Sequence, residues 1–287
     1  MKILVTGCNG QLGRELHTAI EARREGITTY IDIDDLDLTD REAVGEFIRE
    51  GEFSHIINCA AYTAVDRAEE EKLQCAAVNS DALTNIAHLA GEMGIHVLHV
   101  STDYVFDGCS CRPYNESDKV NPLSVYGITK RKGETALLGL APDSIVVRTG
   151  WLYSPWGKNF VKTMLRLARE NRTVSVVSDQ IGTPTSATDL ASAIVDIVFA
   201  TQWAGGIYHF SNEGVASWYD FAVAAIEAAG ITDCTVNPIP TKDYPTAAVR
   251  PMYAVLDKSK IKATYGLRIP HWRESLVKVV RQIEDQR

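Results

Sequence analysis

The stretch that decides the fold is Thr6-Gly-Cys-Asn-Gly-Gln-Leu-Gly13, which directly follows the apolar run Ile3-Leu-Val5. Its three glycines are expected in a turn between a strand and a helix, where a phosphate can approach bare backbone N–H groups. The spacing G-x-x-G-x-x-G departs from the common G-x-G-x-x-G fingerprint, and a purely structural turn also uses glycine. We predict a dinucleotide-binding turn here. Its expected cofactor contacts are Gly7, Gly10, Gln11, Leu12 and Gly13.

Short apolar runs alternate with amphipathic helical patterns through the first half of the chain. The predicted strands cover residues 2–6, 27–33, 55–59, 95–101 and 144–149. Two helical stripes lie between the first three strands, at Leu12, Leu16, Ala19 and Ile20 and at Ala43, Val44, Phe47 and Ile48. Thr39 is the expected N-cap of the second of these helices. This alternation is typical of βαβ units, so we predict an α/β fold with a Rossmann-type, doubly wound parallel sheet.

Prolines punctuate the chain after residue 150, and the helical patterns there are strongly amphipathic. We predict a dinucleotide-binding domain over residues 1–150. Residues 151–287 are expected to form mainly a smaller α/β substrate-binding domain, with some segments returning to the first domain. Ser217-Trp-Tyr-Asp220 has the pattern of a capping box, and the helix that it begins should pack through Trp218 and end at Gly230.

The composition excludes several classes of protein. A formal charge of -8 and a pI near 5.4 argue against a nucleic-acid binder, which would show a basic face. Met1-Lys2 leads directly into a strand pattern without the apolar stretch of a signal peptide or membrane span, so we expect a cytosolic protein without membrane contact. The six cysteines show no paired C-x-x-C spacing, and we predict no metal site.

Asp32 closes the second predicted strand, at the distance where a carboxylate can accept hydrogen bonds from an adenosine ribose. A carboxylate there favours NADH, because the 2′-phosphate of NADPH would bring like charges together. NADPH stays open, since Arg14 can reach a 2′-phosphate if Asp32 turns away. We expect Asp37 and Leu38 beside the adenine, with a plain acidic loop as the alternative.

The third predicted strand ends in the small residues Asn58-Cys-Ala-Ala61, followed by Tyr62 and Thr63. Small side chains at the carboxyl edge of a parallel sheet leave room for a ribose or a nicotinamide, although tight packing gives the same pattern. We predict that Ala61, Tyr62 and Thr63 lie beside the cofactor.

The candidate catalytic side chains begin at the end of the fourth predicted strand, which runs into Ser101 and Thr102. A hydroxyl at a central strand end can hold a carbonyl, although serine and threonine also form turns there. Tyr126 and Lys130 are four residues apart, so on a helix they share one face. A nearby cation lowers the pKa of a tyrosine, which makes Tyr126 a usable proton donor. We predict that Thr102, Tyr126 and Lys130 are catalytic, and that Tyr126 and Lys130 also contact the cofactor.

Motifs spread over essentially the whole chain resemble those of the dTDP-4-dehydrorhamnose reductase family, within the extended short-chain dehydrogenase/reductases. They are TGCNGQLG, NCAAYTAVDRAE, STDYVFDG, NPLSVYGITK, RTGWLY, GKNFVKTMLRLA, DQIGTPTSATDLA, YHFSNEG and YPTAAVRP. STDYVFDG and NPLSVYGITK are the most specific. The resemblance implies reduction of the C4 ketone of dTDP-4-dehydro-L-rhamnose by NADPH or NADH. The product would be dTDP-L-rhamnose, a precursor of cell-surface polysaccharide.

The same resemblance implies that Tyr126 protonates the C4 oxygen while Thr102 polarises the ketone and Lys130 tunes Tyr126. Asp103 and Trp151 match positions that meet the sugar. Trp151 also suits an apolar wall against a 6-deoxy sugar, although a buried tryptophan at a domain junction would look the same.

The nucleotide diphosphate is expected in the second domain. Arg250 is the first candidate donor because a guanidinium matches phosphate geometry, with Lys158 and Lys162 as weaker candidates. Some family members are described as homodimers bridged by a metal through carboxylates. Glu15 matches one of those positions but Thr188 stands at another, so a homodimer stays open without the metal.

Two other functions would use part of the same set of motifs. A nucleotide-sugar 4,6-dehydratase or 4-epimerase would share the Tyr/Lys pair, but a dehydratase commonly has an Asp-Glu pair where this chain has Asp103-Tyr104. A non-catalytic binding protein similar to the regulatory subunit of methionine adenosyltransferase could keep the dinucleotide pocket alone. The intact Thr102, Tyr126 and Lys130 argue against that alternative.

Overall fold

A six-stranded parallel sheet in the order β10-β5-β4-β3-β1-β2 organises the computed structural model, which describes residues 1–286. Its strands are β1 (Lys2–Thr6), β2 (Ile27–Ile31), β3 (His55–Asn58), β4 (His96–Thr102), β5 (Ile145–Thr149) and β10 (Gly206–His209). The five strands predicted for the first half are present, with ends within two residues of the prediction. The order reverses at β1, because β2 lies on one side of it and β3 on the other.

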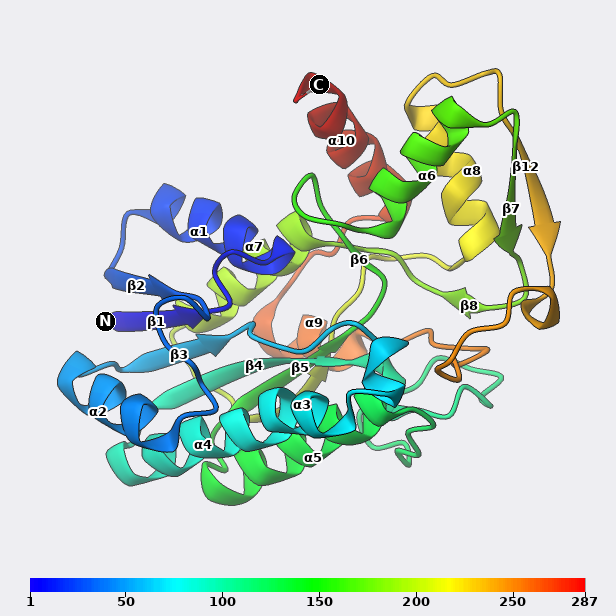
Figure 1. Ribbon diagram of the computed structural model, residues 1–287. Coiled ribbons are helices and arrows are strands. Elements are labelled where there is room, and N and C mark those ends of the chain that lie inside the picture. The colour runs from blue at the N-terminus through cyan, green and yellow to red at the C-terminus, as the bar shows by residue number, and fades with distance from the viewer. Residues whose placement is uncertain (287) are drawn as a thin grey trace.

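Helices cover both faces of the sheet, as Figure 1 shows. One face carries α1 (Gln11–Arg23) and α7 (Ala187–Val198), and the other carries α2 (Arg41–Gly51), α4 (Ala82–Met93) and α5 (Val125–Leu140). Successive side chains of β1 point to opposite faces, so Ile3 packs against the first pair of helices and Leu4 against the other three. The predicted α/β doubly wound fold is confirmed.

The N-cap of α2 differs from the prediction. Asp40, not Thr39, accepts the N–H groups of Glu42 and Ala43, at 3.0 and 3.1 Å. Asp40 is the last residue with extended backbone before the helix, whereas Thr39 lies one residue earlier and donates its hydroxyl to Asp37 at 2.7 Å. The prediction of Thr39 was therefore wrong by one position.

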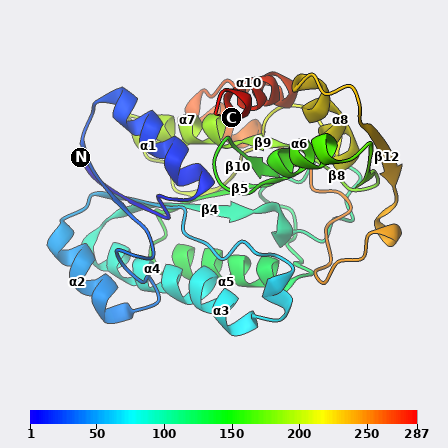
Figure 2. The same cartoon turned by 45° about the horizontal axis from the view of Figure 1, so that its top comes forward.

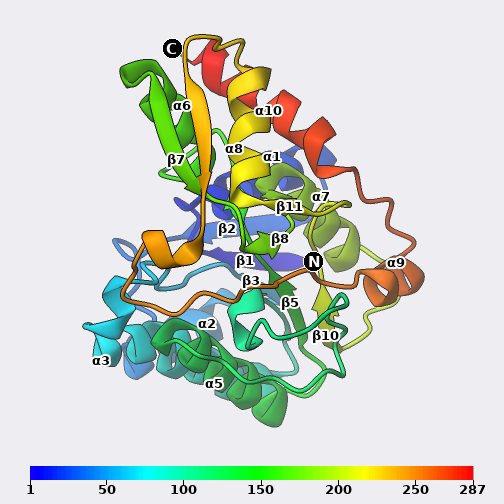
Figure 3. The same cartoon turned by 90° about the vertical axis from the view of Figure 1, so that its right-hand side faces the viewer.

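A second packing unit lies beyond the carboxyl edge of the sheet (Figure 3). It contains α6 (Phe160–Glu170), α8 (Trp218–Ala228), α10 (Trp272–Asp285) and the parallel pair β7 (Thr173–Val177) and β12 (Thr235–Ile239). Phe221, Trp272 and Leu276 are among its buried side chains. The predicted capping box at Ser217 is present, and Gly230, with φ of 67°, follows the end of α8.

Several short elements connect these units. They are α3 (Lys72–Ala76), a π-turn (Ala77–Asp81), α9 (Ser259–Tyr265), β6 (Leu152–Tyr153), β8 (Ile181–Gly182), β9 (Thr185–Ser186), β11 (Ala216–Ser217) and 3₁₀ turns at Arg67–Glu69, Asp103–Val105 and Thr241–Asp243. No helix within residues 1–286 is both long and apolar enough to cross a bilayer.

The second half of the chain also builds part of the first sheet. Helix α7 packs beside α1, and β10 extends the sheet next to β5 (Figure 2). Only after these two elements does the chain continue into α8, β12 and α10.

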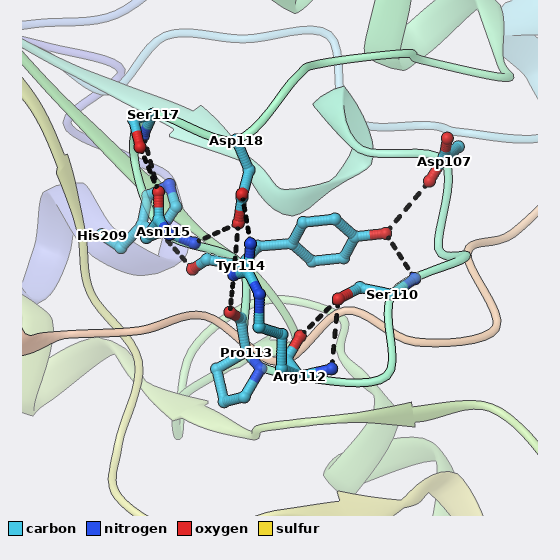
Figure 4. Close-up of polar contacts among 9 residues, drawn as sticks. All are labelled: Asp107, Ser110, Arg112, Pro113, Tyr114, Asn115, Ser117, Asp118 and His209. Carbon is cyan, nitrogen blue, oxygen red and sulfur yellow. Dashed lines mark hydrogen bonds and ion pairs between the residues drawn. The ribbon is translucent and has the colours of Figure 1, made fainter.

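Polar side chains fix the segment Asp107–Asp118, which follows the fourth strand (Figure 4). The Tyr114 hydroxyl donates to Asp107 at 3.0 Å, and Arg112 pairs with Asp118, with 2.7 Å between Nη2 and Oδ1. Tyr114 also exchanges backbone hydrogen bonds with Val255 and Asp257, at 2.9 and 2.7 Å. The backbone contacts of Tyr114 join this segment to the C-terminal part of the chain.

Candidate active site

A cavity of about 960 Å³ opens at the carboxyl edge of the sheet, where the strand order reverses. Ligands of doubly wound sheets bind at such a reversal, because the connecting loops diverge there. Every residue predicted to contact the cofactor lines this cavity. They are Gly7, Gly10, Gln11, Leu12, Gly13, Asp32, Asp37, Leu38, Ala61, Tyr62, Thr63, Tyr126 and Lys130.

The glycine turn has the backbone that a phosphate-binding loop requires. Gly7 has a φ of 68°, and a Cβ there would lie 2.7 Å from the backbone nitrogen of Ala60. Helix α1 begins at Gln11, and its N-cap, Gly10, supplies no side-chain hydrogen bond to the first turn. The N–H groups of that turn and the positive end of the helix dipole therefore suit an anionic group such as a dinucleotide diphosphate.

The two residues that bear on the choice of dinucleotide lie on either side of this turn. Asp32 accepts the N–H of Asn9 and of Ile33, each at 2.8 Å. Arg14 donates from Nε to the Asn9 carbonyl at 3.1 Å, with its guanidinium 5.5 Å from the ring centre of Trp156. Both are therefore tied to the glycine turn.

The predicted reaction centre lies in the same cavity, lined by Thr102, Asp103, Tyr126, Lys130 and Trp151. Helix α5 reaches it because Gly127 lets the helix approach the turn after β4: a Cβ there would lie 2.3 Å from the Tyr104 carbonyl oxygen. Ser124 caps α5 by accepting the N–H of Gly127 at 3.2 Å. This close approach brings the α5 tyrosine to the hydroxyl at the end of β4.

Burial shifts the ionisable groups of this centre towards their neutral forms. It raises the pKa of the Tyr126 phenol, which the Thr102 hydroxyl opposes, and it raises the pKa of Asp103 to about 7. It also lowers the pKa of Lys130 to about 8. Thr102 donates its hydroxyl to Asp103 at 3.1 Å.

Burial is the largest influence on the pKa of Tyr126 and Lys130 is not among the groups that shift it, so the tuning of Tyr126 by Lys130 stays a prediction. The Lys130 amine lies against the Val100 carbonyl and the His99 ring, with Nζ 2.7 Å from the oxygen and 3.0 Å from Nε2. Sequence reasoning missed His99. A polar residue between the apolar positions of a buried strand was the signal that could have identified it.

Trp151 forms one wall of the cavity together with a residue that the sequence pattern had assigned to packing alone. The rings of Trp151 and Trp218 are stacked, with centroids 3.6 Å apart and planes at 9°. Trp151 has a φ of 52°, which is unusual for a bulky side chain. Because Trp218 comes from the start of α8, the second packing unit contributes directly to the site.

Arg250, predicted to bind the substrate diphosphate, lies outside the cavity wall. Its guanidinium pairs with Asp66, at 2.6 Å between Nη2 and Oδ2, and Asp66 also accepts the N–H of Ala248 at 3.1 Å. Of the two weaker candidates, Lys158 lines the cavity, whereas Lys162 donates from Nζ to the Pro155 carbonyl at 3.0 Å.

Glu15 matches a metal-bridging position of the family. It is buried here and accepts a hydrogen bond from Trp156 Nε1 at 2.8 Å. Thr188 is exposed on α7. Among residues 1–286 no group of three or more His, Cys, Asp and Glu side chains is arranged to hold a metal. The six cysteines are free thiols.

Comparisons with known proteins agree with this arrangement. Residues 1–284 match the family described as RmlD substrate binding domain. A dTDP-4-dehydrorhamnose reductase of Aggregatibacter actinomycetemcomitans is 41% identical over 284 residues, covering 96% of this chain and 97% of that protein. The crystal structure of a dTDP-4-dehydrorhamnose reductase from Clostridium acetobutylicum has a TM-score of 0.95 and 41% identity, with 99% and 100% of the two chains covered.

A dTDP-4-dehydrorhamnose reductase from Bacillus anthracis, solved in complex with NADP, has a TM-score of 0.93 and 35% identity, with 98% and 99% of the two chains covered. The predictions of a dinucleotide-dependent reductase and of its family are confirmed. This chain belongs to the dTDP-4-dehydrorhamnose reductase family.

Proposed function

We propose that the chain reduces the C4 ketone of dTDP-4-dehydro-L-rhamnose with NADPH or NADH, giving dTDP-L-rhamnose for cell-surface polysaccharide. The observation that carries the proposal is that the glycine turn and the trio Thr102, Tyr126 and Lys130 face one cavity. Dinucleotide and keto sugar can therefore meet at the end of β4.

The bound nicotinamide supplies the hydride, and the chain supplies the proton and the geometry. Tyr126 is half-buried and has a raised pKa, so its phenol is protonated at neutral pH and can give a proton to the C4 oxygen. Thr102, at the strand end, can donate a hydrogen bond to the same oxygen and so stabilise the charge that develops there. Lys130, which lines the same cavity, is our proposed partner of the nicotinamide ribose.

The sugar and its nucleotide are proposed to lie towards the second packing unit. The stacked Trp151 and Trp218 offer an apolar surface for the 6-methyl group of a deoxy sugar. Arg250 remains our proposed donor to the diphosphate, for which its guanidinium has to share or leave Asp66. A cytosolic location and a homodimer remain predictions.

The test is the loss of nicotinamide absorbance when purified protein is mixed with enzymatically prepared dTDP-4-dehydro-L-rhamnose, with NADPH and NADH in parallel. We expect rapid oxidation and dTDP-L-rhamnose as product. A keto sugar formed from a dTDP-hexose without net cofactor consumption would instead identify a dehydratase. Dinucleotide binding without oxidation of either cofactor would favour another sugar or a regulatory binding protein.

A further inference from the structure

A buried chain of hydrogen bonds lies behind the amine of Lys130. The ring of His99, on β4, has Nε2 3.0 Å from Lys130 Nζ and Nδ1 3.0 Å from the Asn58 amide nitrogen. Asn58, at the end of β3, accepts the Thr6 hydroxyl at 2.6 Å. Thr6, Asn58, His99 and Lys130 are each at most 3% exposed. A missing partner in this chain of contacts would therefore leave a buried polar group unpaired.

The possible donors and acceptors in this chain offer one complete pattern for the ammonium and another for the neutral amine of Lys130. If Lys130 is an ammonium, all its protons are donors, so His99 Nε2 must accept and the ring proton must sit on Nδ1. Asn58 then turns its amide oxygen to Nδ1 and its NH₂ group to Thr6, whose hydroxyl can accept as well as donate.

If Lys130 is a neutral amine, it has one lone pair. It can donate to Val100 and accept from His99 Nε2–H, while Nδ1 accepts from the Asn58 NH₂ group. In either pattern every buried polar atom of the chain has a partner. Leaving one of them unpaired would carry a desolvation penalty.

We propose that His99, oriented by Asn58, is a positioning residue that holds Lys130 in both of its charge states, accepting from the ammonium and donating to the amine through the same Nε2 atom. On the net loss of one proton to solvent, the Lys130 ammonium passes a proton to His99 Nε2, Nδ1 gives up its own proton and the Asn58 amide turns over. The ring is neutral in both end states.

The surroundings of both groups support two accessible charge states. Burial lowers the pKa of Lys130 to about 8. Glu134, Cys59 and Cys75 have the opposite, smaller effect on this pKa. Glu134 is itself buried against Arg148, with 2.7 Å between Oε2 and Nη2. Burial and the Lys130 charge keep the pKa of His99 well below its usual value, so His99 does not compete for the proton.

The first experiment reads the His99 tautomer by ¹⁵N NMR of histidine-labelled protein without cofactor, at pH 6.0 and pH 9.5. The signals of His99 among the seven histidines are those that disappear in His99→Gln. We expect the Nδ1–H tautomer at the lower pH and the Nε2–H tautomer at the higher pH. An unchanged tautomer, or an imidazolium at pH 6.0, would overturn the proposal.

The second experiment compares the pH profile of kcat in His99→Gln and His99→Leu, and it rests on the proposed function. A glutamine amide can accept from an ammonium or, turned over, donate to an amine, whereas leucine can do neither. We expect His99→Leu to lower kcat by about 10- to 100-fold. The part of the kcat profile that reports the ionisation of Lys130, here called the lysine limb, should move to lower pH. The sugar KM should change less than about threefold, and His99→Gln should recover most of kcat.

The control is His209→Gln, which removes another fully buried histidine that does not line the cavity. It should lower thermal stability without moving the lysine limb. If His99→Leu keeps the wild-type lysine limb, the positioning role is wrong. It is also wrong if His99→Leu fails to fold and His99→Gln, like His209→Gln, loses thermal stability without moving the lysine limb. A tautomer change without turnover of any sugar would contradict the proposed function and leave this inference standing.

Discussion

Burial shifts the pKa values of three side chains of the reaction centre in the direction that favours their neutral forms. The pKa values of the Tyr126 phenol and the Asp103 carboxyl are raised, and that of the Lys130 amine is lowered to about 8. Removal from water penalises the charged form of each group. Reduction of a ketone to an alcohol consumes a proton, so a protonated phenol beside the carbonyl site is the state that the reaction requires.

Replacing the proton donor tests its role. Tyr126→Phe should lower turnover by about 10²- to 10⁴-fold, because the ring remains but the proton is lost. Dinucleotide affinity should change less than about threefold. Steady-state rates and fluorescence titration with NADPH measure the two effects. Tyr104→Phe, in the ring packed edge-on against Tyr126, is the matched control and should lose far less. A near-normal rate in Tyr126→Phe would exclude it as the donor.

Asp103 should make stability depend on pH. Its pKa rises from 3.8 to about 7 on folding, so the folded state holds the proton more tightly than the unfolded chain does. This contribution is complete below about pH 4 and is lost as the pH rises to about 7. The amide introduced by Asp103→Asn resembles the protonated carboxyl and does not titrate. The free energy of unfolding in urea should therefore be measured at pH 5 and pH 8 for both proteins. From pH 5 to pH 8, the stability of Asp103→Asn relative to the wild type should rise by about 3 kcal/mol. Parallel pH dependence in both proteins would refute the shifted pKa.

At the scale of elements, local signals fix where helices begin and how closely they approach the site. The capping box of α8 and the bare N-terminus of α1 follow from a few adjacent residues. Helix α2 shows the limit of such reading. Two neighbouring residues can both cap a helix, and the backbone conformation at Asp40 selects one of them.

Mutation of the two candidate caps separates them. Asp40→Ala should lower the free energy of unfolding by about 1 kcal/mol, because two N–H groups of α2 lose their acceptor. Thr39→Ala, the control, should cost less than about 0.5 kcal/mol, since its exposed hydroxyl bonds only to Asp37. Chemical denaturation at one pH gives both values. Equal losses would mean that Asp40 is not the principal cap.

At the scale of the whole molecule, the two halves of the sequence share one core. Leu190 and Ile194 of α7 pack with Leu16 of α1, and β10 pairs with β5. Trp218 of the second packing unit completes the cavity that the first sheet opens. Folding of the dinucleotide site is therefore expected to need residues far beyond position 150.

A truncation tests this dependence. A fragment of residues 1–150 lacks α7 and β10, which leaves the apolar face of α1 uncovered. We expect this fragment to bind a hydrophobic dye, to show no cooperative unfolding and to lose dinucleotide binding. The full chain serves as the control. Cooperative thermal unfolding of the fragment would show that the first half folds independently.

The sequence alone was sufficient to predict the five strands of the first half, the glycine turn and the Tyr126/Lys130 pair. Each depends on residues close together in the chain, through side-chain periodicity, the conformational freedom of glycine or a fixed helical spacing. The family could be recognised for the same reason, because its motifs are short and local.

Only the tertiary structure decided which distant side chains meet. It paired Arg250 with Asp66, stacked Trp151 on Trp218 and placed His99 against Lys130. It also decided the balance of charge in the site. Desolvation depends on everything packed around a group, and it is the largest influence on the raised pKa of Tyr126. No local pattern in the sequence records how deeply a side chain is buried or which distant group lies beside it.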